Sequence, residues 1–234
     1  MLKELTELLR SVSTSASPDD FKRAIIDENL LGKKTVATRK LTNQRLSELY
    51  ALDNRVPIFR ILRQLWNIDH SGRPLLAFMV AYARDPLLRL TLDAVLGARP
   101  GSMVLTANLD ACFADRVGNR FNPSTRSAIA RNAASSWTQS GHLKGRVKKL
   151  RSKPVGTPAC VAFAMLLGYT SGIHGRAILS TDWIRILDLT YSELMALVEA
   201  AKRQGLIEFK QLGDVVEVGF PQLLLPSEEA LCHV

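Results

Sequence analysis

The chain has 234 residues, of which 47% are hydrophobic and 23% are charged, and its formal net charge is +9. This composition excludes intrinsic disorder or a coiled coil as a description of the whole chain, and no apolar run reaches the roughly 18 residues of a membrane span. The first residues show no export signal, and the cysteines (Cys112, Cys160 and Cys232) are odd in number and far apart. We therefore expect a cytoplasmic protein with free thiols and no membrane contact.

The first half of the sequence is predicted to be an all-helical bundle, which we place at residues 1–115. Helix starts are marked by Ser17-Pro18 with acids in the next turn and by Asp85-Pro86, and an apolar stripe follows Pro57. These signals predict helices at residues 17–29, 35–50, from 57 onward, 75–83 and 85–96. The helix at 75–83 is apolar on every side and should be buried. We interpret this half as a packing and interaction domain without chemistry.

The second half, residues 116–225, alternates short helices with short strand-like pieces. Asn122-Pro123 opens a predicted helix over residues 124–138. The basic strip that follows, residues 142–154, is predicted to be a loop or an irregular hairpin in the position of a wing. An apolar helix over residues 159–167 comes next and requires burial on all sides.

The clearest local pattern lies near the C-terminus. Thr190 and Glu193 form a capping box ahead of a helix that Gly205 ends. Two short strands at 206–211 and 215–220 follow, and a short helix opening at Thr181 comes before. This order is typical of a winged helix-turn-helix, which serves as a protein-docking module or as a DNA reader. Acidic side chains on its helix and hairpin favour a structural or docking role here, but both roles stay open.

Residues 226–234, after this segment, are predicted to be a C-terminal tail.

The positive charge is confined to one segment. Residues 116–181 contain eleven basic and no acidic side chains, whereas the other 168 residues contain 20 basic and 22 acidic ones. Such a field of one sign is typical of a protein with a polyanionic partner, and it favours nucleic acid over a basic surface that is merely solvated. A smaller acid-free cluster could extend the same surface: Lys33, Lys34, Arg39, Lys40 and Arg45.

The sequence therefore predicts binding to double-stranded DNA, mainly through phosphates and with little base specificity. Eight side chains are the candidate DNA-binding residues: Arg126, Arg131, Lys144, Arg146, Lys148, Lys149, Arg151 and Lys153. His142 lies in the same strip and could also contact a phosphate, although an exposed loop histidine more often has no such role. Two alternatives remain: an assembly adaptor whose basic surface docks an acidic protein, and an RNA-binding protein. RNA ranks below duplex DNA because the basic segment has few exposed aromatic candidates for base stacking.

The sequence matches none of the enzyme motifs that its residues suggest. The segment Gly32-Lys33-Lys34-Thr35 fails the phosphate-binding-loop pattern at two positions. No histidine or cysteine has a second metal ligand at suitable spacing, and no G-x-S-x-G motif occurs. Paired carboxylates for nuclease chemistry are missing from the basic segment. We expect no catalytic residue, no metal and no cofactor.

Three stretches of the chain resemble the BrxA family of BREX bacteriophage-exclusion systems. They are Asp27–Lys34 followed by Thr38-Arg39-Lys40, the helix that runs from Ser124 into Trp137-Thr-Gln-Ser-Gly-His-Leu143, and the segment Asp182–Phe220. The resemblance spans about residues 20–220. It implies a non-enzymatic, mainly α DNA-binding component of a phage-defence system, with a NusB-like helical bundle, winged helix-turn-helix elements and a small β-hairpin. It also implies other BREX proteins as partners; the oligomeric state stays open.

Overall fold

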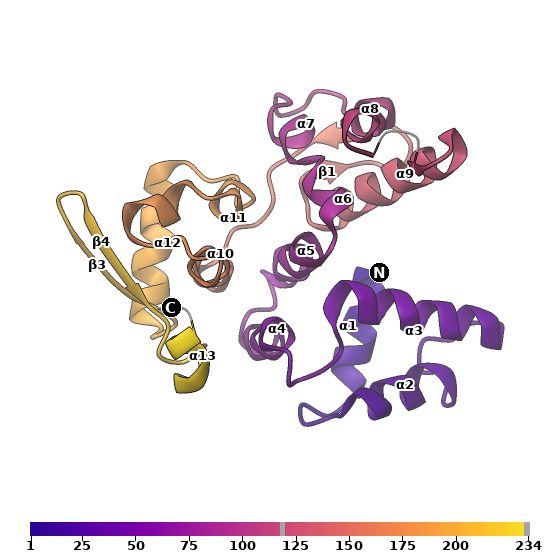
Figure 1. Ribbon diagram of the computed structural model, residues 1–234, viewed down its shortest axis with the longest axis horizontal. Helices are drawn as coiled ribbons and strands as arrows, with labels where there is room; N and C mark the ends of the chain where they lie inside the picture. The colour runs from indigo at the N-terminus through magenta and orange to yellow at the C-terminus, as the bar shows by residue number, and fades with distance from the viewer. Residues whose placement is uncertain (118–119, 232–234) are drawn as a thin grey trace.

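The computed structural model describes residues 1–117 and 120–231, and these residues form a mainly helical fold with two small antiparallel hairpins. Helix α5 (Arg73–Arg84) lies at the centre of the molecule (Figure 1). Helices α1 to α4 lie on one side of it, α6 to α9 with the first hairpin on a second side, and α10 to α13 with the second hairpin on a third. The predicted fold class is confirmed at this level.

Four helices precede α5, and their ends follow signals in the sequence. Ser17 begins α2 as a reciprocal cap: its hydroxyl accepts from the Asp20 amide, and the Asp20 carboxylate accepts from the Ser17 amide at 2.9 Å. The first helix adds to the predicted set and buries Leu5 and Leu8. The bounds are α1 (Leu2–Ser11), α2 (Pro18–Ile26), α3 (Val36–Tyr50) and α4 (Pro57–Ile68).

The two apolar helices of the sequence pack against each other. α5 and α10 (Pro158–Thr170) are buried along most of their lengths, as their composition predicts. Buried residues from both halves of the chain join into one continuous hydrophobic core. The predicted division between residues 115 and 116 falls inside α8 (Thr106–Val117).

The prediction of one continuous helix over residues 85–96 is wrong. The structure divides it into α6 (Pro86–Arg89) and α7 (Leu92–Leu96). Thr91 lies at the break and is fully buried; its hydroxyl donates to the Leu88 carbonyl at 2.6 Å and accepts from the indole Nε1 of Trp137 at 2.7 Å. Trp137 belongs to α9 (Pro123–Gln139), which Asn122 caps as predicted. The break between α6 and α7 thus coincides with a buried contact to a helix that is distant in the sequence.

Residues 157–220 form what we call the terminal unit. α10 packs against α11 and α12, and α12 begins with the predicted capping box of Thr190 and Glu193. The strands pair from Glu208 opposite Gly219 to Leu212 opposite Val215. After α10, the elements are the 3-10 helix η2 (Gly175–Ser180), α11 (Asp182–Arg185), α12 (Tyr191–Arg203), β3 (Glu208–Leu212) and β4 (Val215–Gly219).

Part of the predicted C-terminal tail is structured: α13 (Pro226–Leu231) follows the terminal unit. Arg60 of α4 donates to the Leu223 carbonyl at 3.0 Å and to the Glu228 carboxylate at 2.5 Å, which ties α13 to the first half of the chain. Residues 232–234, which include Cys232, lie outside the described residues. Across the described part of the chain, no helix combines the length and the apolarity that crossing a membrane requires.

Candidate nucleic-acid interface

The basic strip folds into a short hairpin. β1 (Leu143–Lys144) pairs antiparallel with β2 (Leu150–Arg151). The turn depends on Gly145, whose φ of 101° favours glycine and at which a Cβ would lie 2.1 Å from the Lys148 carbonyl oxygen. The ammonium of Lys149 donates to the Gly145 carbonyl at 2.8 Å and closes the turn. We call residues 143–151 the basic hairpin.

A third extended segment, residues 101–104, lies along β2. The amide of Arg151 donates to the Ser102 carbonyl, and the Gly101 amide donates to the Arg151 carbonyl, both at 2.8 Å. These bonds satisfy the amide and the carbonyl of Arg151 on the edge of β2 that faces away from β1. They hold the basic hairpin in one orientation on the protein surface.

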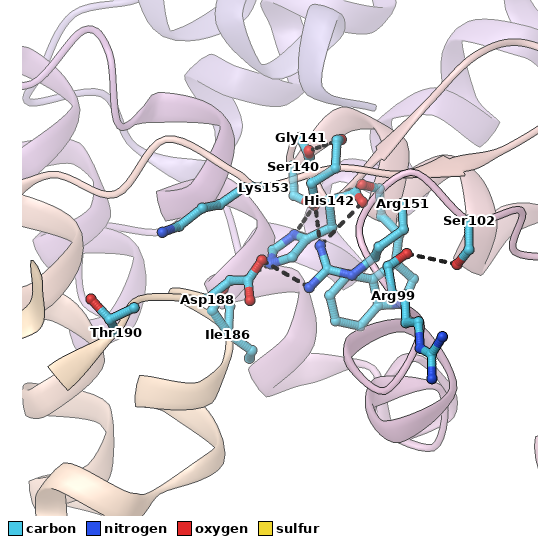
Figure 2. A network of polar contacts seen from close by, with 12 residues as sticks. Arg99, Ser102, Ser140, Gly141, His142, Arg151, Lys153, Ile186, Asp188 and Thr190 are labelled. Atoms are coloured by element: carbon cyan, nitrogen blue, oxygen red, sulfur yellow. Dashed lines mark hydrogen bonds and ion pairs between the residues drawn. The ribbon is translucent and has the colours of Figure 1, made fainter.

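A polar joint fixes the basic hairpin to the terminal unit (Figure 2). The Arg151 guanidinium donates to the Asp188 carboxylate at 2.8 Å and to the carbonyl oxygens of His142, at 3.4 Å, and Ser152. The His142 ring bonds from Nε2 to the Ile186 carbonyl at 2.8 Å. Both Asp188 and Ile186 lie in the connection between α11 and α12, so the hairpin and that connection form one rigid assembly.

His142 is fully buried, and the expectation that it could contact a phosphate is wrong. Its ring packs against Trp137, with ring centroids 4.8 Å apart. Burial lowers the pKa of His142 to about 3. Because the Ile186 carbonyl can only accept, Nε2 carries the proton of the neutral ring, and Nδ1 lies 2.8 Å from the Ser140 hydroxyl. His142 is therefore an uncharged structural residue.

The stability of the protein is expected to fall as the pH falls below about 6.5, the ordinary pKa of histidine. The unfolded chain then binds a proton at His142 that the folded chain, with a pKa of about 3, does not bind. This difference lowers the free energy of unfolding by about 2 kcal/mol between pH 7 and pH 5. Urea titrations at the two pH values measure it. The variant His142→Gln should lose that contribution, whereas the exposed His70 supplies the control His70→Gln; equal pH dependence in both variants would contradict the assignment.

Arg151 is also a structural residue, which corrects its place among the DNA-binding candidates. Its side chain is 2% exposed and its charge is paired with Asp188. The register explains this: Arg151 lies opposite Leu143 and shares its buried face, while Leu150 points to the surface. A guanidinium in this position cannot reach a phosphate.

Two further candidates are held by carboxylates. Arg126 of α9 pairs with Asp110 of α8 at 2.9 Å, and both side chains are mostly buried. Lys153 pairs with Glu193 at 2.7 Å, and this contact, together with the bonds from Thr190, lowers the pKa of Glu193 to about 2. Arg126 is thus held between α8 and α9, whereas the exposed Lys153 would have to exchange Glu193 for a phosphate in order to bind DNA.

Five candidates remain available. Lys144, Arg146 and Lys148 are exposed, and Lys149 is partly exposed at the turn. Arg131 is exposed on α9 and donates to the Ser127 hydroxyl at 2.7 Å. Within residues 1–117 and 120–231, none of these five forms an ion pair. The structure thus brings four of the eight predicted cations together in the basic hairpin, with a fifth on the helix that leads into it.

The structure adds one cation that sequence reasoning missed. Arg99 is exposed, and its carbonyl accepts from the Ser102 amide at 3.0 Å and from the Ser102 hydroxyl at 2.6 Å, next to the basic hairpin (Figure 2). No local signal places it there, because its segment joins the hairpin only through pairing with β2. The smaller predicted cluster lies on and before α3, in another part of the molecule (Figure 1), and its Lys33 pairs with Glu4 at 2.9 Å.

The described residues contain no group of three or more His, Cys, Asp or Glu side chains that could hold a metal ion. Comparison with known protein families, with curated proteins and with solved structures found no match for this chain.

Proposed function

We propose that the protein binds double-stranded DNA without catalysing a reaction, mainly through phosphate contacts of the basic hairpin. One observation carries the proposal: Lys144, Arg146, Lys148 and Lys149 are gathered in one turn, and no carboxylate in the described residues pairs with them. Cations so placed repel one another and gain most from a partner with closely spaced negative charges, such as a phosphate backbone.

Duplex DNA fits the basic hairpin better than single-stranded RNA. Recognition of single strands stacks bases on exposed aromatic rings. The basic hairpin contains no aromatic residue. Of the aromatic rings in the basic segment, Trp137 and Phe163 are fully buried, Tyr169 is 7% exposed, and the partly exposed Phe121 has the Arg120 guanidinium 5.4 Å from its ring centre. The surface therefore offers cations for a phosphate backbone but few aromatic rings on which unpaired bases could stack.

Binding is expected to weaken steeply with salt. If the five available cations each neutralise one phosphate, log K should fall against log salt concentration with a slope of about −4.5. Fluorescence anisotropy with a labelled generic duplex at several salt concentrations measures the slope. A slope between about 0 and −1 would contradict phosphate binding, because it corresponds to one released counterion or none. Absence of any complex at low salt would favour the adaptor function instead.

We also propose that the terminal unit is a winged helix-turn-helix that supports the basic hairpin and docks protein, rather than the element that reads DNA. Residues 157–220 contain five basic and seven acidic side chains, so they would repel a phosphate backbone. Leu212 and Val215, at the tip of the second hairpin, are 84% and 64% exposed. Exposed aliphatic side chains beside acids suit contact with another protein.

The role in phage defence is a further proposal, supported by the resemblance to the BrxA family alone, as are the NusB-like bundle and the BREX partners. It places the protein in the cytoplasm, together with the DNA it would bind. The plating efficiency of phage on cells that carry the complete defence system tests it. Loss of the gene should restore plaque formation, and unchanged protection would contradict the role.

A further inference from the structure

The basic hairpin carries aliphatic side chains on its exposed face. Met103 forms a bridge with Leu150, and these side chains are 47% and 43% exposed. Lys144 lies opposite Leu150 in the adjacent strand. At the tip, Val147 is 89% exposed, between Arg146 and Lys148 in the sequence. The surface therefore alternates cations with apolar side chains.

A surface that binds only phosphates has no need of these apolar groups. Exposed aliphatic side chains that gather in one place mark a contact surface, because each costs free energy in water. The partner must therefore present apolar surface beside negative charge. The minor groove of duplex DNA has this arrangement: deoxyribose forms its walls, base edges form its floor, and phosphates line both edges.

We propose that the basic hairpin inserts its tip into the minor groove, with Val147 against the base edges and the neighbouring cations on the phosphates. Apolar wedges of this kind unstack a base step and bend the duplex. The inference rests on the proposed function and names its preferred substrate: duplex DNA with a weakened base step, such as a nick.

Contacts at both ends of the basic hairpin would hold Val147 in place as a wedge between bases. A tip that separates stacked bases must resist being pushed back. The tip is closed by the Lys149 contact with Gly145 at 2.8 Å, and the base of the hairpin is fixed by the Arg151 contact with Asp188 at 2.8 Å.

The test compares an intact duplex with the same duplex nicked at its centre. The wild-type protein should bind the nicked duplex about tenfold more tightly, since a nick removes part of the cost of unstacking. Val147→Ser should lose that preference and keep the salt dependence. The matched control is Val155→Ser, at a 62% exposed valine outside the hairpin; it should behave like the wild type. Netropsin, which occupies the minor groove, should displace the wild-type protein.

The results separate this inference from the proposed function. Equal affinity for both duplexes, retained by Val147→Ser and insensitive to netropsin, would overturn groove insertion and leave phosphate binding intact. No binding to either duplex would overturn both. Equal losses in Val147→Ser and Val155→Ser would also overturn insertion, because the effect would then not belong to the tip.

Discussion

Replacing Arg146, Lys148 and Lys149 of the basic hairpin with glutamate is expected to lower the affinity for duplex DNA at least about 100-fold at near-physiological salt. Each replacement removes a phosphate contact and adds a repulsive charge. Arg146 and Lys148 are exposed, and the Lys149 side chain makes a single hydrogen bond, to the Gly145 carbonyl, while its backbone pairing with Val104 is kept, so the fold should remain intact. Fluorescence anisotropy measures the affinity, and circular dichroism with a thermal melt verifies the fold.

A matched variant distinguishes a local contact from a general effect of charge. Lys202, Arg203 and Lys210 belong to α12 and β3 of the terminal unit. Their replacement with glutamate changes the net charge by the same amount, and the affinity should stay within about threefold of the wild type if only long-range charge acts there. A loss equal to that of the hairpin variant would mean that the terminal unit contacts DNA. No loss in the hairpin variant would refute the proposed interface.

Local signals were sufficient to predict most of the helices. The capping boxes at Ser17 and Thr190 and the asparagine cap at Asn122 all act within one helical turn, so the sequence around them determines where α2, α12 and α9 begin. The all-apolar composition of α5 and α10 likewise predicted their burial. α1 has an equally clear stripe, with Leu2, Leu5 and Leu9 on one side, so it was predictable too.

The burial of Arg151 could not be read from composition. A strand that exposes Leu150 and buries an arginine reverses the usual preference of side chains. The reason lies in the register, since Arg151 shares a face with Leu143, and in Asp188, which lies 37 positions further along the chain. Only the pairing of the strands shows which cation of the basic strip turns inward.

The burial of His142 and Thr91 also depends on contacts with residues far away in the sequence. His142 bonds to Ile186, 44 positions away, and Thr91 accepts a hydrogen bond from Trp137, 46 positions away. A basic strip is normally solvated, so sequence alone placed His142 on the surface. The charge of the strip thus predicted where exposed cations gather, but the three-dimensional contacts decide which of its residues are exposed and which are buried.

The variant Arg151→Ala is expected to destabilise the protein by about 2 to 3 kcal/mol, because the buried guanidinium leaves an empty space and its hydrogen-bond partners lose their donor. Asp188 would lose its cation, and the carbonyl oxygens of His142 and Ser152 would lose their donor. Urea unfolding at pH 7 measures the change. Lys149→Ala supplies the control at a partly exposed position two residues earlier, where a loss below about 0.5 kcal/mol is expected.

The pair of variants also separates the two roles that an arginine in this hairpin could have. If Arg151 is structural, Arg151→Ala lowers the free energy of unfolding, whereas Lys149→Ala lowers the affinity for DNA and barely changes stability. If Arg151 instead contacted phosphate, its alanine variant would be as stable as the wild type and would reduce the salt slope by about one. The buried position of the side chain and its contact with Asp188 at 2.8 Å favour the first outcome. The basic hairpin then has two kinds of cation, one that holds it in place and four at its surface that form no ion pair in the described residues.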